Sequence, residues 1–281
     1  MAFGLLSSVT WGAADFAAGL VTRTLGAFMT VALTQAVGLA GAATFVVLSG
    51  EPMPSPEALA WGLAAGVVGL VGASAFYRVL ADGRMSIGSP LVAVIGAGLP
   101  VLVALLFGER LPPSDLAGIA LGLVAVVLVS MPARSGEQLD HGRLDRRLLL
   151  LAGLAGAGLA GFFLLIDRSA ALGAGPWWIL TSARFTTVAI LAIGILATRR
   201  GRPATSGRWP LLIGIGLGDL LGNAFFLLSN AQGALSVAVV LSSLYPVTTI
   251  VLARFVLHER LRGGQLIGVA AAMVGVVLIA I

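Results

Sequence analysis

The stretch GASAFYRVLADGRMS, residues 72–86, has a counterpart in GNAFFLLSNAQGALS, residues 222–236. The match extends without a gap from residues 66–131 to residues 216–281, and GERL at 108–111 falls on HERL at 258–261. The identities within the quoted stretches are Gly72 with Gly222, Phe76 with Phe226, Ala81 with Ala231, Gly83 with Gly233 and Ser86 with Ser236. A chance match of this length is improbable. The chain therefore contains an internal repeat.

The composition is that of an integral membrane protein. Of the 281 residues, 58% are hydrophobic and only 10% are charged, and the mean hydropathy is +1.04. A soluble domain carries about a quarter charged residues, so this chain could not cover a surface that faces water. Its apolar runs of roughly 18–25 residues are long enough to cross ~30 Å of hydrocarbon as helices. The first run lacks a basic segment before it and is longer than a signal peptide needs, so we expect it to remain as a helix.

The apolar runs predict ten transmembrane helices. Between glycine, proline and arginine punctuation they lie at residues 2–22, 27–48, 58–81, 85–107, 114–131, 147–167, 176–198, 209–231, 235–257 and 263–281. The one long polar connection, PARSGEQLDHGRLDRR at 132–147, follows the fifth helix. We therefore expect a first repeat at residues 1–131, a polar linker at 132–146 and a second repeat at 147–281.

Five helices in each repeat is an odd number, so the two repeats must run in opposite directions through the membrane. The predicted fold is all-α, with ten transmembrane helices arranged as two inverted five-helix repeats. Inverted repeats are the architecture of many secondary transporters, whose substrate site lies near the membrane midplane where the repeats meet.

The arginines predict the orientation of the chain. Those in the connections after the first, third, fifth, seventh and ninth helices are Arg23, Arg84, Arg134, Arg143, Arg146, Arg147, Arg199, Arg200, Arg202, Arg208, Arg260 and Arg262. The opposite face holds only Arg110 and Arg168. By the positive-inside rule we expect the linker to be cytoplasmic, both termini to be outside, and the protein to lie in the cell (inner) membrane.

Three charged residues are predicted to lie deep in the membrane. They are Asp15 in WGAADFAAGL, Asp219 in GIGLGDLLGN and Arg184 in LTSARFTTV. A charge at this depth costs about 2.5–3.5 kcal/mol even on the gentler insertion scales, which makes it a functional candidate. Burial strengthens proton binding by a carboxylate and a nearby cation weakens it, so an acid between these influences could load and release a proton. Alternatively, Arg184 pairs with one aspartate only to tie helices together.

Polar and aromatic residues near these charges are weaker candidates for the same pathway. Asn223 follows Asp219 by four residues and Trp11 precedes Asp15 by four, so each pair shares a helix face. The further candidates are Gln35, Tyr77 and Tyr245. The Tyr245–Pro246 pair should interrupt the ninth helix, and broken helices tend to line transporter sites.

Other features of the sequence are expected to be structural. Gly214, Gly218 and Gly222 recur every four residues, which favours close packing on a neighbouring helix. Trp177 and Trp178 follow Pro176 at the start of the seventh helix and are typical of an interfacial belt. In both repeats an acid and an arginine end a helix, and we expect them to tie that end to its connection; they are Glu109 with Arg110 and Glu259 with Arg260.

The sequence argues against catalysis and cofactors. It has no Cys and none of the motifs of zinc proteases, serine hydrolases or nucleotide-binding loops. We therefore expect no enzyme activity, no cofactor and no metal site. The net charge of +5 belongs to arginines in short connections without aromatic platforms beside them, so we expect no nucleic-acid partner.

Several residues resemble the EamA domain, two copies of which form ten-helix members of the drug/metabolite transporter superfamily. They are the Trp11–Gly12 pair, the Arg184–Phe185 pair, the spacing from Pro246 to Glu259, and the glycine-containing last helix. The resemblance covers residues 2–131 and 147–281 and implies export or exchange of small metabolites. Gln35 stands where the family often has arginine, and Gly96 stands where Pro246 predicts a proline, so the first repeat departs from the pattern.

The combined reading is a secondary transporter with alternating access, expected to export a small polar metabolite such as an amino acid in exchange for protons. Asp15 and Asp219 are expected to bind a proton or a cation, with Arg184 as their counter-charge or as an anchor for a substrate carboxylate. The alternatives are an uncoupled facilitator or exchanger, and a flippase-like or scaffolding component that binds lipid-linked intermediates. The expected partners are a small-molecule substrate and membrane lipid, and the glycine-rich faces could pack within one chain or between two copies.

Overall fold

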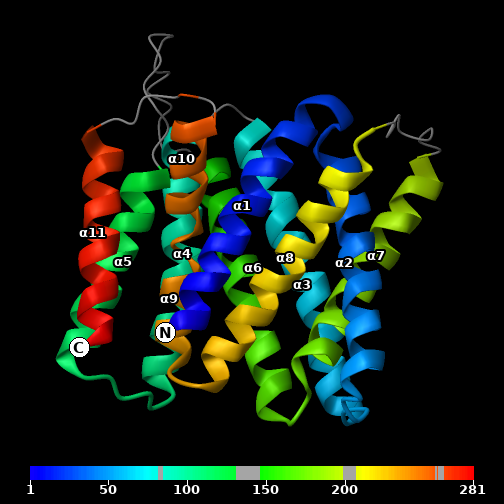
Figure 1. The fold of residues 1–281 in the computed structure, drawn as a ribbon, viewed down its shortest axis with the longest axis horizontal. Helices are drawn as coiled ribbons and strands as arrows, with labels where there is room; N and C mark the ends of the chain where they lie inside the picture. The colour runs from blue at the N-terminus through cyan, green and yellow to red at the C-terminus, as the bar shows by residue number, and fades with distance from the viewer. Residues whose placement is uncertain (82–84, 131–145, 199–206, 257, 259–262) are drawn as a thin grey trace.

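The structure, a computed structural model, describes residues 1–81, 85–130, 146–198, 207–256, 258 and 263–281, and the side chains within these ranges except at residues 23, 77 and 80–90. The described part contains helices and no strand (Figure 1). The helices are α1 (Ala2–Leu25), α2 (Ala27–Ser49), α3 (Pro56–Ala81), α4 (Met85–Leu106), α5 (Pro113–Ser130), α6 (Arg146–Ala171), α7 (Pro176–Thr198), α8 (Trp209–Ala231), α9 (Leu235–Ser242), α10 (Tyr245–Val256) and α11 (Gly263–Ala280).

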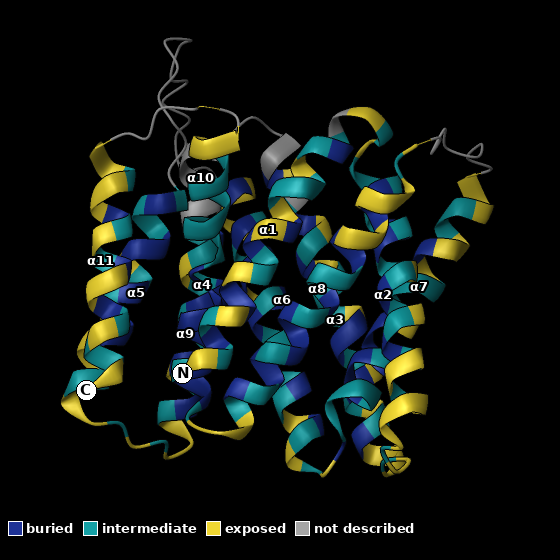
Figure 2. Ribbon diagram, viewed as in Figure 1, coloured by how far each residue is buried: buried dark blue, intermediate teal, exposed yellow. Residues whose placement is uncertain are grey.

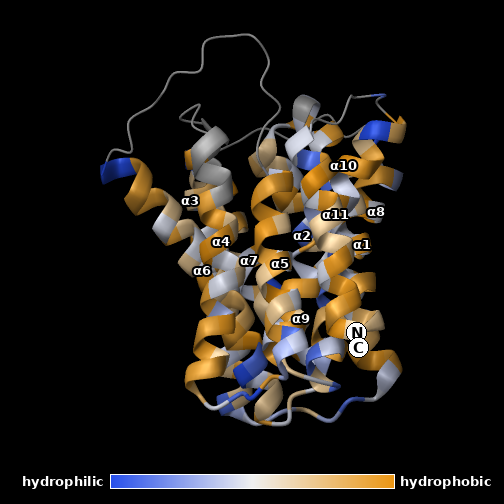
Figure 3. Ribbon diagram, turned by 90° about the vertical axis from the view of Figure 1, so that its left-hand side faces the viewer, coloured by the Kyte–Doolittle hydropathy of each residue, from blue (hydrophilic) through white to orange (hydrophobic). Residues whose placement is uncertain are grey.

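These helices form ten membrane crossings, as the sequence predicts. Within the described residues, nine segments are long and apolar enough to span a membrane, and one of them joins α9 to α10 as Leu235–Val256. The tenth crossing is α4, whose apolar stretch is Leu91–Leu106. Apolar residues run along the helices over most of their length (Figure 3), and the exposed ones lie on outward faces such as those of α11 and α7 (Figure 2). The chain is a multi-pass membrane protein.

The helix packing follows the inverted repeat. The repeat relates α1 to α6, α2 to α7, α3 to α8, α4 to the α9–α10 pair and α5 to α11. When the two halves are exchanged, the packing of α3 on α6 becomes that of α8 on α1, and the packing of α3 on α7 becomes that of α8 on α2. The pairs α2 with α7, α4 with α9 and α5 with α11 map onto themselves. Both termini lie at the same end of the bundle (Figure 1), as ten crossings require.

The ninth crossing is broken, as the sequence predicts. Helix α9 ends at Ser242 and α10 begins at Tyr245, so the break lies immediately before the predicted Tyr245–Pro246 pair. Pro246 has no backbone N–H and cannot continue an α-helical ladder, but it is tolerated in the first turn of a helix. Its repeat partner in α4 is Gly96, and α4 runs unbroken through that position.

Glycines set the closest helix contacts. A Cβ on Gly158 of α6 would collide with the Cα of Gly72 in α3, and a Cβ on Gly118 of α5 would lie 2.7 Å from the carbonyl oxygen of Gly275 in α11. Such small residues let backbones approach closely where no hydrophobic effect drives association.

The predicted glycine face of α8 is only partly correct. Gly218 and Gly222 lie against Ala14 and Trp11 of α1, but no atom of another helix lies within 4 Å of the position of a Cβ on Gly214. Gly214 is exposed near the start of α8, although Leu212 and Ile215 beside it pack in a buried cluster with Val21 of α1. The four-residue repeat therefore marks a packing face for two of its three members.

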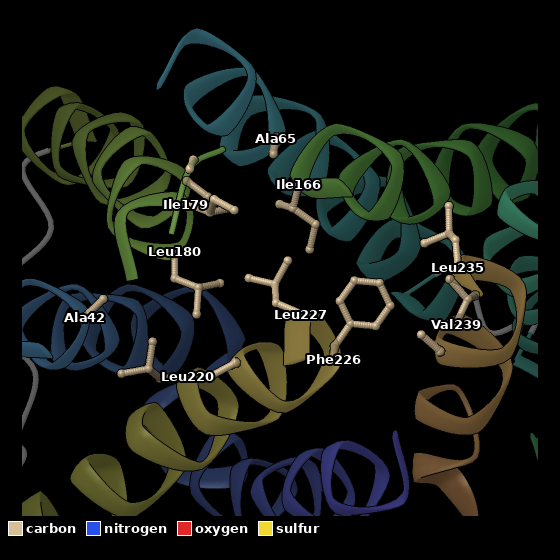
Figure 4. Close-up of a cluster of buried hydrophobic side chains, with 14 of the residues drawn as sticks. Ala42, Ala65, Ile166, Ile179, Leu180, Leu220, Phe226, Leu227, Leu235 and Val239 are labelled. Carbon is tan, nitrogen blue, oxygen red and sulfur yellow. The ribbon is translucent and has the colours of Figure 1, made fainter. Parts of the chain in front are cut away.

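The bundle is sealed at the end where the termini lie. There a single cluster of buried apolar residues joins α2, α3, α4, α6, α7, α8 and α9; Figure 4 labels Ala42, Ala65, Ile166, Ile179, Leu180, Leu220, Phe226, Leu227, Leu235 and Val239. At the opposite end of the bundle, where α5 ends and α6 begins, the buried residues instead form separate clusters. One contains Val79, Val92 and Leu148, and the other Val21 and Leu212.

Two carboxylates bind helix N-termini across the repeats at this sealed end. Glu109 accepts hydrogen bonds from the backbone N–H groups of Leu235 (3.0 Å) and Ser236 (3.2 Å) in the first turn of α9. Glu51 does the same for Trp177 (3.5 Å) and Trp178 (3.3 Å) in α7. A negative charge is favoured here because the first N–H groups of a helix lack intrahelical partners.

Glu109, at the end of the fourth crossing, therefore ties that end to α9 and not only to the connection that follows it. Arg110 is exposed, and it forms no ion pair with a described residue, so its expected structural role stays a prediction. Glu259 and Arg260 lie outside the described residues. The tryptophans predicted to be interfacial lie at the start of α7. The indole of Trp178 donates a hydrogen bond to the Glu51 carbonyl oxygen (3.2 Å), and Trp177 stacks on Phe45.

We predict that Glu109→Ala lowers the free energy of unfolding by about 1–2 kcal/mol, because two N–H groups of α9 lose their acceptor. Thermal unfolding of the purified protein in detergent measures the effect. The control is Glu57→Ala, whose side chain is 63% exposed and lies 3.9 Å from Arg168, and which should change stability by less than about 0.5 kcal/mol. Equal shifts in the two variants would contradict the role of Glu109 as a helix cap.

Candidate functional site

A cavity of about 340 Å³ lies near the middle of the bundle, between the sealed end and the linker. Both repeats contribute to its wall, and the lining includes residues of α1 to α8 together with Ser243 and Tyr245 at the break in the ninth crossing. A volume of roughly 300–1,000 Å³ is typical of a small-molecule site. The cavity lies where the inverted repeats meet, as expected for a transporter site.

The charged centre of the cavity is an ion pair between α7 and α8. Arg184 Nη1 lies 2.9 Å from the Asp219 carboxylate oxygen Oδ2. The same nitrogen donates a hydrogen bond to Gln35 Oε1 of α2 (2.6 Å). Arg184 is 5% exposed, whereas the Asp219 side chain is 34% exposed. A buried guanidinium is tolerated because it is paired and hydrogen-bonded. The ion pair and Gln35 thus connect three helices from both repeats.

The sequence of α2 makes room for this arginine. A Cβ on Gly38 would lie 2.9 Å from Arg184 Nη1 and 3.0 Å from its Cζ, so the guanidinium lies directly against the α2 backbone. Gly38 is one helical turn after Gln35, and the two residues form a flat, polar seat on one face of α2. Arg184 is therefore held from the side by Gly38 and at its tip by Gln35 and Asp219.

Asp15 lines the same cavity but stands apart from this pair. It is exposed, and among the described residues its carboxylate has no hydrogen bond and no ion pair. Of the three deep charges predicted from the sequence, two are brought into contact and the third is left facing the cavity. With all three ionised, the site carries one carboxylate more than its single arginine can neutralise.

Asn223 lies one helical turn after Asp219 on α8 and forms hydrogen bonds with it. Its amide nitrogen donates to the carbonyl oxygen of Asp219 (2.8 Å) and weakly to the Asp219 carboxylate (3.4 Å). Among the described residues neither its Oδ1 atom nor Arg184 Nε has a hydrogen-bond partner, and both atoms are buried. Unpaired buried polar atoms are costly in a protein interior.

Trp11 forms the centre of an aromatic wall next to Asp15. Its indole N–H donates to the Asp219 carbonyl oxygen (3.3 Å) and its ring lies over Gly222, where a Cβ would collide with it. The Tyr245 ring meets it edge-on at 6.3 Å between centroids, and the Phe163 ring lies at 5.9 Å. The tryptophan both packs on α8 and lines the cavity.

The cavity also contains residues that the sequence pattern did not single out. Phe162 and Phe163 of α6, Thr187 of α7 and Ser243 at the break all line it. The FF pair inside an apolar run and the serine three residues before Pro246 were signals that could have identified three of these positions. The Tyr77 side chain, a predicted candidate, lies outside the described residues.

The chain belongs to the EamA-like transporter family, whose model matches residues 1–131 and 147–281. A solved crystal structure, titled only "Crystal structure of protein", shares the fold with a TM-score of 0.75 and 20% sequence identity, and the match covers 99% of this chain and 97% of that one. At this identity the likeness shows the fold alone. No curated protein matches the chain at a significant level. The family, the repeats and the cavity define a membrane transporter of the drug/metabolite transporter superfamily.

We predict an asymmetric effect of breaking the ion pair. Asp219→Asn leaves a buried guanidinium without its carboxylate and should lower the free energy of unfolding by roughly 2–3 kcal/mol. Arg184→Gln leaves a carboxylate that is already one-third exposed and should cost less, because water can solvate it. Denaturant unfolding of both single variants and the double variant measures this. A double variant as unstable as the sum of the singles would contradict the pairing.

Proposed function

We propose that the protein is a secondary active transporter in the inner membrane that exports a small metabolite in exchange for protons, with the linker in the cytoplasm. The observation that carries the proposal is the unpaired carboxylate of Asp15 in a midplane cavity that is sealed on one side. Alternating access requires such a site, which is closed to one side of the membrane while it exchanges with the other.

The two ends of the bundle differ in a way that suits this cycle. The apolar cluster and the Glu51 and Glu109 caps hold the end with the termini together. On the linker side the flanking clusters are separate, and Asp219 and Asp15 are accessible to solvent. Under the proposed orientation this arrangement is the inward-facing state. The outward-facing state would follow from exchanging the conformations of the two repeats.

Asp15 is the group best placed to carry the proton. The titratable residues that line the cavity with it are Asp219 of α8, Arg184 of α7 and Tyr245 of α10. The residues that α2 contributes, Val31 and Gln35, do not titrate. Asp219 is neutralised by Arg184, whereas protonation of Asp15 requires no ion pair to break. A proton taken up from one side can therefore be released to the other when access changes.

We predict that Asp15→Asn abolishes export while leaving the protein folded. Extracellular metabolites are compared between cells that make equal amounts of the native protein, the Asp15→Asn variant and the matched control Asp115→Asn, which lies in the first turn of α5 outside the cavity. One class of compound should accumulate outside with the native protein and the control only. A protonophore should reduce that accumulation.

Two outcomes would contradict the proposal. Export that persists in Asp15→Asn and is unaffected by the protonophore would indicate an uncoupled facilitator. Identical external metabolites in all cultures, with lipid bound to the folded protein, would indicate a component that handles lipid-linked intermediates.

A further inference from the structure

We infer that the substrate is a small organic cation: an amine with an apolar body and no carboxylate of its own. The inference rests on the proposed transport function and names the class of compound that the cavity takes. It is carried by the juxtaposition of the unpaired Asp15 carboxylate, an aromatic wall and an arginine that is already occupied.

The charges of the cavity favour a cation. Asp219 is neutralised by Arg184, so Asp15 is the one described charge in the wall without a partner. An ammonium group placed beside Asp15 would supply the missing counter-charge, and a hydrogen bond between charged groups is about twice as strong as a neutral one. An added anion would instead face a surplus carboxylate.

The arginine is not available to a substrate carboxylate. Its Nη1 atom is shared between Asp219 and Gln35, and its Nε atom, which has no hydrogen-bond partner among the described residues, is buried against Gly38 with 5% of the residue exposed. An amino acid would have to displace Asp219 from this pair to anchor its carboxylate, and the displaced carboxylate would join Asp15 as a second unpaired acid. This cost does not arise for an amine.

The rest of the wall matches the apolar body of such an amine. Trp11 lies one turn before Asp15 on α1, and Tyr245 and Phe163 lie around it. Aromatic faces attract organic cations within about 6 Å of the ring centroid.

Proton and amine would then compete for the same carboxylate. When the ammonium binds Asp15, the proton held there leaves, and when the proton returns the ammonium is released. This mutual exclusion is sufficient for exchange and needs no second coupling site. It also sets a direction: lower pH must weaken amine binding.

The test is equilibrium binding of radiolabelled phenethylamine to the purified full chain in detergent. Two competitors of similar size separate the charges: phenylalanine adds a carboxylate, and 2-phenylethanol replaces the ammonium by a hydroxyl. We expect phenethylamine to bind and to release protons into a weakly buffered medium. Each competitor should displace it about tenfold more weakly than unlabelled phenethylamine or worse. Asp15→Asn should weaken binding about tenfold or more, and Asp115→Asn should not.

Several results would overturn the inference. They are equal competition by phenylalanine, unchanged binding in Asp15→Asn, or no binding of phenethylamine by the folded native protein. Competition on the native protein does not depend on whether the Asp15 variant folds. If cells still export another class of compound in a proton-dependent way, the proposed function stands and only the amine assignment fails.

Discussion

The structure depends on how one arginine is kept inside a membrane protein. Arg184 lies near the middle of α7, where a buried charge without a partner would be costly. Gly38 gives it a seat on α2, Gln35 accepts from it, and Asp219 of α8 neutralises it. These contacts hold three helices from both repeats at one point. Because they use up Asp219 and Gln35, they leave Asp15 as the cavity's free acid.

The inverted repeat explains why the cavity lies where it does. Helix pairs that map onto each other when the halves are exchanged surround a point near the midplane, and both halves supply residues to it. The two repeats are not equivalent, because Pro246 breaks the ninth crossing while Gly96 lets α4 continue. The asymmetry places Ser243 and Tyr245 in the wall, opposite an unbroken helix. Independently of the break, α9 begins at a carboxylate supplied by the other repeat, Glu109.

Much of the fold followed from the sequence. Hydropathy gave the ten crossings because a helix needs about 20 apolar residues to cross the bilayer, and the 66–131 match to 216–281 gave the inverted repeat. The break at residues 243–244 was predictable from the chemistry of proline. Gly214 was wrongly expected to pack, because a four-residue spacing advances by about 40° per step around a 3.6-residue helix, so Gly214 and Gly222 face different directions.

The candidate site was only partly predictable. Depth identified Asp15, Asp219 and Arg184, since ionisable residues are rare in apolar runs. Which aspartate pairs with the arginine could not be read from one sequence, because this depends on how α1, α7 and α8 are rotated about their axes. The aromatic wall was missed in part because phenylalanine in an apolar run is also the usual lipid-facing residue. Glu51 was not singled out because its helix-capping contacts lie 126 and 127 positions away in the chain.

The role proposed for Asp15 requires that its side chain face water in a cavity rather than lipid. The native chain has no cysteine, so single cysteines can be labelled without background. Asp15→Cys and Ala13→Cys place a thiol on two exposed positions of α1 at nearly the same depth, of which only the first lines the cavity. A membrane-impermeant, charged thiol reagent applied to protein in lipid vesicles should modify Asp15→Cys and leave Ala13→Cys unmodified. Modification of neither position, or of both equally, would contradict the account.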